Sequence, residues 1–268
     1  MVDDPRAELA GLAASLRAYL EWQQDSGATG LPRRQGPKAG AAATAATTPI
    51  AAPAPIAAPS TSSSTSATAS NDRHVRLPEL AAEVAGCQKC VLGSTRTQTV
   101  FARGNPGAQL CFVGEAPGAD EDAQGLPFVG RAGQLLDRMI GAMGLSPERD
   151  VYVCNIIKCR PPDNRRPEPD EIASCIPYLH EQLALVQPRV IVALGNTSVA
   201  ALLDVKLGIT RVRGQWKLYR GRTLVMPTYH PSYLLRPGPQ QIEAKRQAWD
   251  DLRLVMKELG LSLPAKGT

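Results

Sequence analysis

Four short runs of almost continuously apolar residues are the clearest pattern in this chain. They cover residues 110–113, 151–157, 190–194 and 223–226. Parallel strands buried on both faces show such continuous runs rather than an alternating pattern. Helical spacing between and after them predicts helices near 134–143, 168–186, 197–203 and 241–259, the second kinked or restarted at Pro177. The pattern predicts a three-layer α/β/α fold with a central four-stranded, mainly parallel sheet.

The N-terminal part of the chain has a different character. Residues 1–26 are predicted to form a helix, because leucines recur at helical spacing after an N-capping Asp4. Residues 27–72 are predicted to form a disordered linker, since the stretch 40–70 is rich in Ala, Pro, Ser and Thr and has no charged residue. Such a segment buries too little apolar surface to offset the entropy of ordering. Residues 73–268 are expected to form the globular domain.

Composition and charge limit the expected cellular compartment and binding partners of the protein. The formal net charge of +5 favours a polyanionic partner only slightly over an ordinary basic surface. The chain shows no apolar stretch of transmembrane length, and its first residues lack the pattern of a signal peptide. We therefore expect a cytoplasmic, monomeric protein without membrane contact. In that setting its six cysteines indicate thiols or metal ligands rather than disulfides.

The cysteines have the spacing of a metal site. Cys87 and Cys90 form a Cys-x-x-Cys pair, and Cys159 and Cys175 supply two more thiols. A closely spaced pair chelates with little loss of loop entropy, and four thiolates complete a site for zinc or iron. The remaining two cysteines, Cys111 and Cys154, lie within predicted strands and are interpreted as small buried hydrophobes.

Polar residues follow each predicted strand. Gly114 and Glu115 follow the first, Asn155 lies toward the end of the second, Gly195 follows the third and His230 comes after the fourth. Ligands of open α/β sheets bind outside the carboxyl ends of the strands. The sequence therefore predicts one site at this edge of the sheet.

Each candidate also has an ordinary structural interpretation. Residues 114–118 lack the spacing of a nucleotide-binding loop and can be a tight turn. Phe128, flanked by glycines and a proline, is either a core side chain or a stacking platform. Asn155 is either satisfied within the fold or a base contact, and His230 either completes a turn or faces the pocket.

Taken together, these segments resemble the family 4 uracil-DNA glycosylases, the iron–sulfur group of that superfamily. The resemblance covers roughly residues 80–259 and rests on Cys87-x-x-Cys90, Gly114-Glu-Ala-Pro-Gly118, Gly125-Leu-Pro-Phe-Val-Gly130, Asn155-Ile-Ile-Lys-Cys159-Arg-Pro-Pro, Cys175 and His230-Pro-Ser-Tyr-Leu-Leu-Arg236. It implies hydrolysis of the N-glycosidic bond of uracil flipped out of DNA, leaving an abasic site for base excision repair. It also implies a 4Fe-4S cluster on Cys87, Cys90, Cys159 and Cys175.

The chemistry of the side chains agrees with roles in holding a flipped base. Phe128 would stack on uracil, and the Asn155 amide would accept from N3–H and donate to O4. His230 would donate to O2 as negative charge develops on the departing base. The resemblance assigns exclusion of the thymine methyl group to Glu121.

The resemblance leaves the attacking water without an obvious partner. Ala116 stands where the best-known uracil glycosylases carry an aspartate, so Glu115 is the candidate that positions the water. Backbone groups of this turn, which begins at Gly114, are expected to face uracil. The loop 160–168 contains no histidine, so the covalent trapping known from another branch is not expected.

DNA contacts are expected near the last motif. Leu234 or Leu235 would wedge into the base stack, or would simply pack in the fold, and Arg236 would bind phosphate. Uracil-containing DNA is the predicted partner, and the partner of the N-terminal helix is open. The principal alternative is a non-catalytic, metal-stapled DNA-binding module. An iron–sulfur electron carrier is a third possibility, but the chain has no flavin or second-cluster motif.

Overall fold

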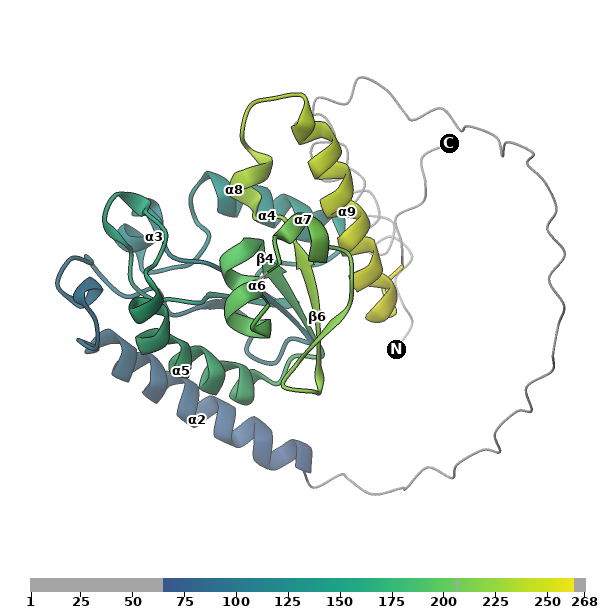
Figure 1. Ribbon diagram of the computed structural model, residues 1–268. Coiled ribbons are helices and arrows are strands. Elements are labelled where there is room, and N and C mark those ends of the chain that lie inside the picture. Colours follow the sequence, from purple (N-terminus) through teal and green to yellow (C-terminus); the bar gives the residue numbers. More distant parts are fainter. Residues whose placement is uncertain (1–64, 206, 263–268) are drawn as a thin grey trace, which may run out of the picture.

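The computed structural model describes residues 65–205 and 207–262. Within these residues a mixed sheet with strand order β1-β3-β2-β4-β6-β5 is covered by helices on both faces (Figure 1). This arrangement agrees with the predicted three-layer α/β/α architecture. The predicted helix at 1–26 and most of the predicted linker lie outside the described residues.

The sheet has a parallel centre and antiparallel edges. Its six described strands are β1 (Arg103–Gly104), β2 (Leu110–Gly114), β3 (Val151–Asn155), β4 (Val190–Leu194), β5 (Lys217–Tyr219) and β6 (Thr223–Thr228). The four apolar runs of the sequence became β2, β3, β4 and β6, which pair in parallel. The predicted four-stranded sheet must be corrected, because β1 and β5 add antiparallel edges. Both are short and partly exposed, so neither shows an apolar run.

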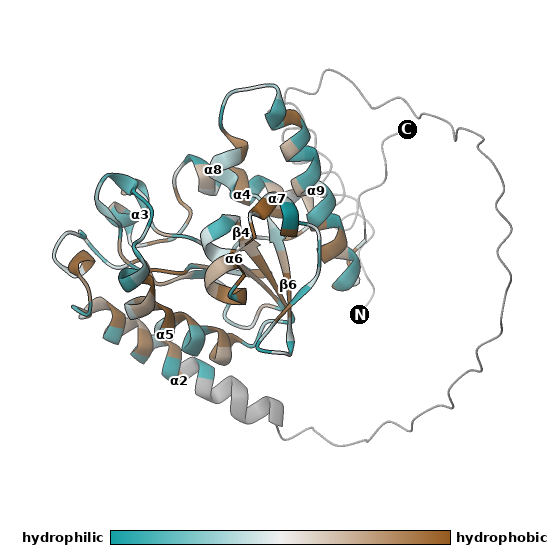
Figure 2. Cartoon of the chain, in the orientation of Figure 1, coloured by the Kyte–Doolittle hydropathy of each residue, from teal (hydrophilic) through white to brown (hydrophobic). Residues whose placement is uncertain are grey.

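The helices divide between the two faces of the sheet. One face is covered by α4 (Arg131–Ala142), α8 (Pro231–Leu234) and α9 (Gln240–Glu258), and the other by α5 (Pro169–Val186) and α6 (Gly195–Leu203). Two further α-helices are α3 (Ala119–Gln124) and α7 (Ile209–Val212), and 3₁₀ turns cover Val91–Gly93 and Pro162–Asn164. Alternate strand residues supply the two apolar layers, which appear brown in Figure 2. Because α5 continues through Pro177, the predicted restart there does not occur.

Helix α2 (Thr65–Ala85) adds an outer layer against α5. Leu77, Leu80 and Val84 are buried there, and the Arg76 Nε atom lies 2.6 Å from Glu181 Oε1. The helix begins at Thr65, inside the range predicted as linker, whereas its described buried side chains come later. None of the described helices combines the length and apolar composition needed to cross a membrane.

The fold brings the ends of distant segments to one edge. The carboxyl ends of β2, β3 and β4 carry Gly114, Asn155 and Leu194, and His230 follows β6. Parallel pairing in register places Gly114 directly opposite Asn155. The parallel centre of the sheet therefore assembles the predicted site.

Two truncations separate the linker from α2. Removal of residues 1–64 is expected to leave the melting temperature nearly unchanged, because the composition of that stretch predicts few contacts with the domain. Removal of residues 1–86 also deletes three buried apolar side chains, each of which contributes about 1.5–3 kcal/mol. Thermal and urea unfolding of both proteins test this. Equal stability of the two truncated proteins would contradict the packing role of α2.

Candidate active site

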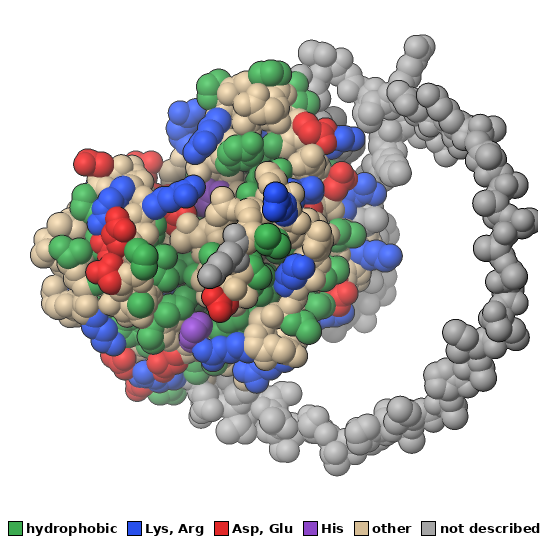
Figure 3. All heavy atoms as spheres, viewed as in Figure 1, with side chains coloured by type: hydrophobic (Ala, Val, Ile, Leu, Met, Phe, Trp, Pro, Cys, Tyr) green, Lys and Arg blue, Asp and Glu red, His purple; other side chains and the backbone are tan. Residues whose placement is uncertain are grey.

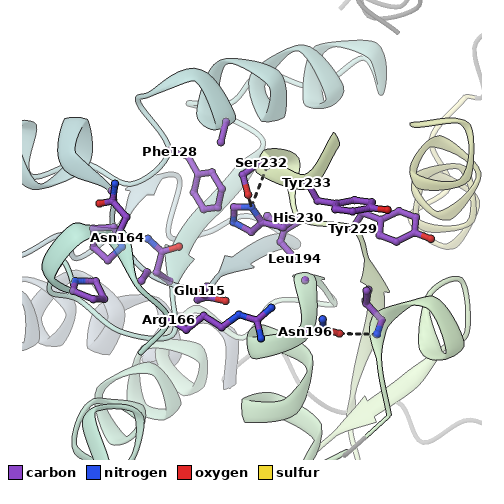
Figure 4. A pocket seen from close by; sticks show the side chains of 18 of the residues that line it. Glu115, Phe128, Asn164, Arg166, Leu194, Asn196, Tyr229, His230, Ser232 and Tyr233 are labelled. Atoms are coloured by element: carbon purple, nitrogen blue, oxygen red, sulfur yellow. Dashed lines mark hydrogen bonds between the residues drawn. The ribbon is translucent and has the colours of Figure 1, made fainter. Parts of the chain in front are cut away.

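A cavity of about 620 Å³ opens at the carboxyl edge of the parallel strands. Its wall includes Glu115, Glu121, Phe128, Asn155 and His230, which come from five different segments of the chain. Figure 4 shows Phe128 and His230 side by side above Glu115. The structure thus brings together the side chains that the sequence placed at this edge.

Asn155 presents an unsatisfied acceptor at the cavity. The residue ends β3 and is only 1% exposed, yet its Oδ1 atom has no hydrogen-bond partner among the described residues. An unpaired buried polar atom costs roughly 1–3 kcal/mol, so native structures rarely leave one without a purpose. A ligand N–H entering the cavity would satisfy this atom. The orphaned oxygen is therefore the strongest sign of a binding site.

A buried lysine fixes the backbone beneath this amide. Lys158 is 1% exposed, and its Nζ atom donates to the Asn155 carbonyl at 2.8 Å and to Gln182 Oε1 at 2.6 Å. Gln182 in turn donates to the Tyr152 hydroxyl at 2.7 Å. The buried ammonium is compensated by these acceptors, and the end of β3 is held in place.

Phe128 occupies a strained backbone position beside the amide. Its φ of 57° lies in the left-handed region, which is unfavourable for a bulky residue. Arg103 of β1 holds the loop by donating to the Pro127 carbonyl at 2.8 Å and pairing with Asp137 at 2.5 Å. A Cβ on Gly133 would lie 1.8 Å from the Phe128 carbonyl oxygen, so only glycine fits there. The surrounding structure therefore imposes the orientation of this aromatic ring.

Glu121 clamps the same loop through its carboxylate. Oε1 accepts from the backbone N–H groups of Val129 and Gly130, both at 3.0 Å, and Oε2 accepts from that of Gly118 at 3.1 Å. Three backbone donors fix the carboxylate on the cavity wall. The Glu121 carboxylate is therefore a rigid group, able to exclude a ligand whose substituents would overlap with it.

The hydrogen bonds of His230 define its tautomer. The residue caps α8, and its Nδ1 atom accepts from the backbone N–H of Ser232 at 3.2 Å. Because an N–H group can only donate, Nε2 carries the proton of the neutral ring. Withdrawal from solvent lowers the pKa of His230 to about 4. The ring is therefore neutral at physiological pH and offers Nε2–H as a donor. Its centroid lies 5.7 Å from that of Phe128.

Glu115 is held by a residue that the sequence analysis did not identify. Its Oε2 atom accepts from the Thr197 hydroxyl at 2.5 Å. Thr197 belongs to the first turn of α6, whereas Glu115 follows β2. Ala116, next in the chain, also lines the cavity but supplies no polar side chain.

The basic residues near the cavity differ in their availability. Arg165, Arg166 and Arg236 all line the cavity, but Arg165 is paired with buried Glu171 at 2.7 Å. The Arg236 guanidinium lies 5.6 Å from the centre of the Tyr233 ring. Figure 3 shows basic side chains in blue on this face, with acidic side chains in red among them. Arg166 and Arg236 at the cavity would attract a polyanion.

The two leucines after the His-Pro turn lie in different environments. Leu234 is 1% exposed and packs in the core, whereas Leu235 is only partly buried against it. Of the pair, Leu235 is the side chain with surface available to a partner.

The four predicted metal ligands lie near one another beside the sheet. Cys159 and Cys175 each interact electrostatically with Cys87, and Cys159 also interacts with Cys90 and Cys175. Burial raises the pKa of Cys159, and that of Cys175 to about 11. Arg96 donates to Cys159 Sγ at 3.2 Å. Within the described residues, no three His, Cys, Asp or Glu side chains are arranged to hold a single metal ion.

Comparisons with known proteins agree with this geometry. A family model of the uracil DNA glycosylase superfamily matches residues 101–253. The chain is 48% identical over 162 residues to the type-4 uracil-DNA glycosylase of Thermotoga maritima, covering 60% of this chain and 84% of that protein. Identity to the type-4 uracil-DNA glycosylase of Saccharolobus solfataricus is 46% over 168 residues, covering 60% and 77%. The chain belongs to the type-4 uracil-DNA glycosylases.

A more distant branch is also recognisable. The type-5 uracil-DNA glycosylase of Pyrobaculum aerophilum is 32% identical over 146 residues, which cover 49% of this chain and 64% of that protein. The family model begins at residue 101, so the first two cysteines and α2 precede it. Membership in the type-4 family therefore rests on the sheet and its edge together with the higher identity to type-4 relatives.

Gly114 tests whether the cavity needs its close packing. A Cβ there would lie 2.4 Å from Asn155 Oδ1 and 2.5 Å from Phe128 Cζ. Gly114→Ala is expected to destabilise the domain by about 1–3 kcal/mol, because overpacking forces neighbours to move. Gly208→Ala is the matched control, since nothing lies within 4 Å of its Cβ. Urea unfolding that gives equal values for the two variants would contradict the packing described at Asn155 and Phe128.

Proposed function

We propose that this chain excises uracil from DNA, hydrolysing the N-glycosidic bond of a flipped nucleotide and leaving an abasic site for base excision repair. The observation that carries the proposal is the unpartnered Asn155 Oδ1 atom, which faces the same cavity as Phe128 and His230. Membership in the type-4 family supports the same reaction. The non-catalytic DNA-binding module is not favoured, because it would give no reason for this cavity.

Asn155 recognises the edge of the base. Its Oδ1 atom accepts from uracil N3–H, and its amide N–H donates to O4. Cytosine presents the opposite pattern at these positions, so a fixed amide rejects it. Lys158 supports this rigidity by holding the Asn155 carbonyl. Phe128 stacks on the face of the base, and its imposed loop conformation keeps the ring ready for that contact.

His230 stabilises the leaving group. As the N-glycosidic bond breaks, its electron pair moves into the uracil ring and negative charge builds on O2. The neutral imidazole donates Nε2–H to that oxygen, because Nδ1 is occupied by the Ser232 N–H. A neutral donor stays available across the physiological pH range, since the pKa of His230 is about 4.

Two carboxylates at the cavity have separate roles in this proposal. Glu115 positions the attacking water and accepts its proton, since Ala116 provides no carboxylate. Glu121 excludes the methyl group of thymine. Hydrogen bonds from three backbone N–H groups hold its carboxylate in place, so it does not move aside for that methyl group. Ala116 lines the wall of the cavity, and backbone groups of the turn that begins at Gly114 face the base.

The rim of the cavity binds the DNA strand. Arg236 and Arg166, which both line the cavity, contact phosphates near the flipped nucleotide. Leu235, rather than buried Leu234, fills the gap in the base stack. We extend the proposal to a monomeric, cytoplasmic enzyme, as expected from the sequence.

The thiols of Cys87, Cys90, Cys159 and Cys175 fit a 4Fe-4S cluster. Cys159 lies near the other three, and Arg96 supplies a donor to the Cys159 sulfur, as cluster-bound sulfurs commonly receive. Bound there, the cluster would join the loop after α2, the loop after β3 and helix α5. Its contribution is structural.

Substitutions in the cavity test the reaction. His230→Ala is expected to lower the single-turnover rate on a uracil-containing oligonucleotide by roughly a hundredfold or more, with little change in DNA affinity. Asn155→Ala should lower the rate and weaken discrimination against cytosine. Released base and abasic-site cleavage are measured on uracil, cytosine and thymine substrates of the same sequence. Wild-type excision by both variants would place the active site elsewhere.

Metal analysis tests the cysteine set. Protein purified without oxygen is expected to be brown and to contain about four irons per chain. Cys175→Ala should lose iron and stability, whereas Cys111→Ala should keep its iron because Cys111 lies outside the set. A colourless, fully active protein with one zinc per chain would overturn the assignment.

A further inference from the structure

Thr197 makes an unusual contact for a threonine in the first turn of a helix. Ser and Thr hydroxyls in helices commonly bond back to a backbone carbonyl, as the adjacent Ser198 does to Leu194 at 3.0 Å. The Thr197 hydroxyl instead donates across the cavity edge to Glu115 Oε2 at 2.5 Å. Two neighbouring hydroxyls in one helix therefore serve different purposes.

We propose that Thr197 is a positioning residue for Glu115 in the hydrolysis of the N-glycosidic bond. The inference rests on the proposed function, in which Glu115 positions the attacking water. A hydroxyl bonded to one carboxylate oxygen fixes the rotation of the carboxyl group. Among the described residues no hydrogen bond to Oε1 is found, so that oxygen remains for the water.

The start of α6 is placed to serve this purpose. Gly195, two residues before Thr197, has a φ of +88°, and a Cβ there would lie 3.1 Å from His230 Cβ. The same turn of chain thus approaches His230 on one side and Glu115 on the other. Packing against the His-Pro turn fixes where the Thr197 hydroxyl stands, and with it the Glu115 carboxylate.

The resulting step balances without another reactant. The water oxygen attacks C1′ of the deoxyribose while the bond from C1′ to N1 of uracil breaks. The electron pair leaves with uracil, whose O2 accepts the His230 hydrogen bond. The water proton passes to Glu115 Oε1. Thr197 keeps its own proton and transfers nothing.

Two substitutions at Thr197 distinguish a role in positioning Glu115 from a role in packing alone. Thr197→Val keeps the shape and removes the hydroxyl, and Thr197→Ser keeps the hydroxyl. Thr197→Val is expected to lower the single-turnover rate roughly tenfold, as a fraction of the 10²–10⁴ that a positioned base contributes. DNA affinity should not change, so the loss should appear in the rate of the chemical step. Thr197→Ser should restore most of that rate.

A double-variant cycle gives the decisive comparison. If Thr197 acts only through Glu115, then adding Thr197→Val to Glu115→Gln causes no further loss of rate. Losses that multiply, or a wild-type rate in Thr197→Val, would overturn the positioning role while leaving uracil excision intact. Thr197→Ala serves as a second hydroxyl-free variant if the valine protein does not fold.

The cycle also distinguishes this inference from the function on which it rests. A Glu115→Gln protein with the wild-type rate would remove Glu115 from the reaction, and Thr197 with it. Failure of the wild-type protein to release uracil would instead overturn the proposed function as a whole.

Discussion

The close approach of two parallel strands at Gly114 is the constraint on which the site depends. The strand register places Gly114 opposite Asn155, and the missing side chain leaves room for the Asn155 carboxamide and the edge of the Phe128 ring. Larger residues would fill the volume that both groups use. The Asn155 amide and the Phe128 ring therefore share one space, which exists because the backbone of β2 ends in glycine.

Around that point the structure uses rigid supports rather than many direct contacts. Lys158 holds the backbone of the amide, Glu121 and Arg103 hold the loop of the ring, and the Ser232 N–H sets the tautomer of His230. Most of these supports are charged groups that bind backbone atoms. Preorganisation of this kind fixes donors and acceptors before a ligand arrives, so that little reorganisation is needed during reaction.

The four central strands of the sheet could be predicted from the sequence, whereas its two edge strands could not. Continuous apolar runs revealed the four parallel strands because burial on both faces leaves a strong pattern. The edge strands β1 and β5 have one neighbour each and so need no such run. Likewise, residues at strand ends were identifiable as Gly114, Asn155 and His230. Thr197 and Arg103 were not, because their importance comes from contacts with Glu115 and the Phe128 loop that are distant in sequence.

Arg103, which restrains the loop of Phe128, lies in the edge strand β1. The stacking contact proposed for Phe128 therefore depends on whether this edge of the sheet is folded. Edge strands open more readily than the centre of a sheet, in local fluctuations that leave the core intact. When β1 separates from β3, Arg103 no longer holds the carbonyl of Pro127, and the strained conformation of Phe128 loses a restraint. A molecule with β1 detached would thus keep its hydrophobic core but lose a restraint on the Phe128 ring. The stacking contact proposed for this ring therefore depends on the edge strand as well as on the core.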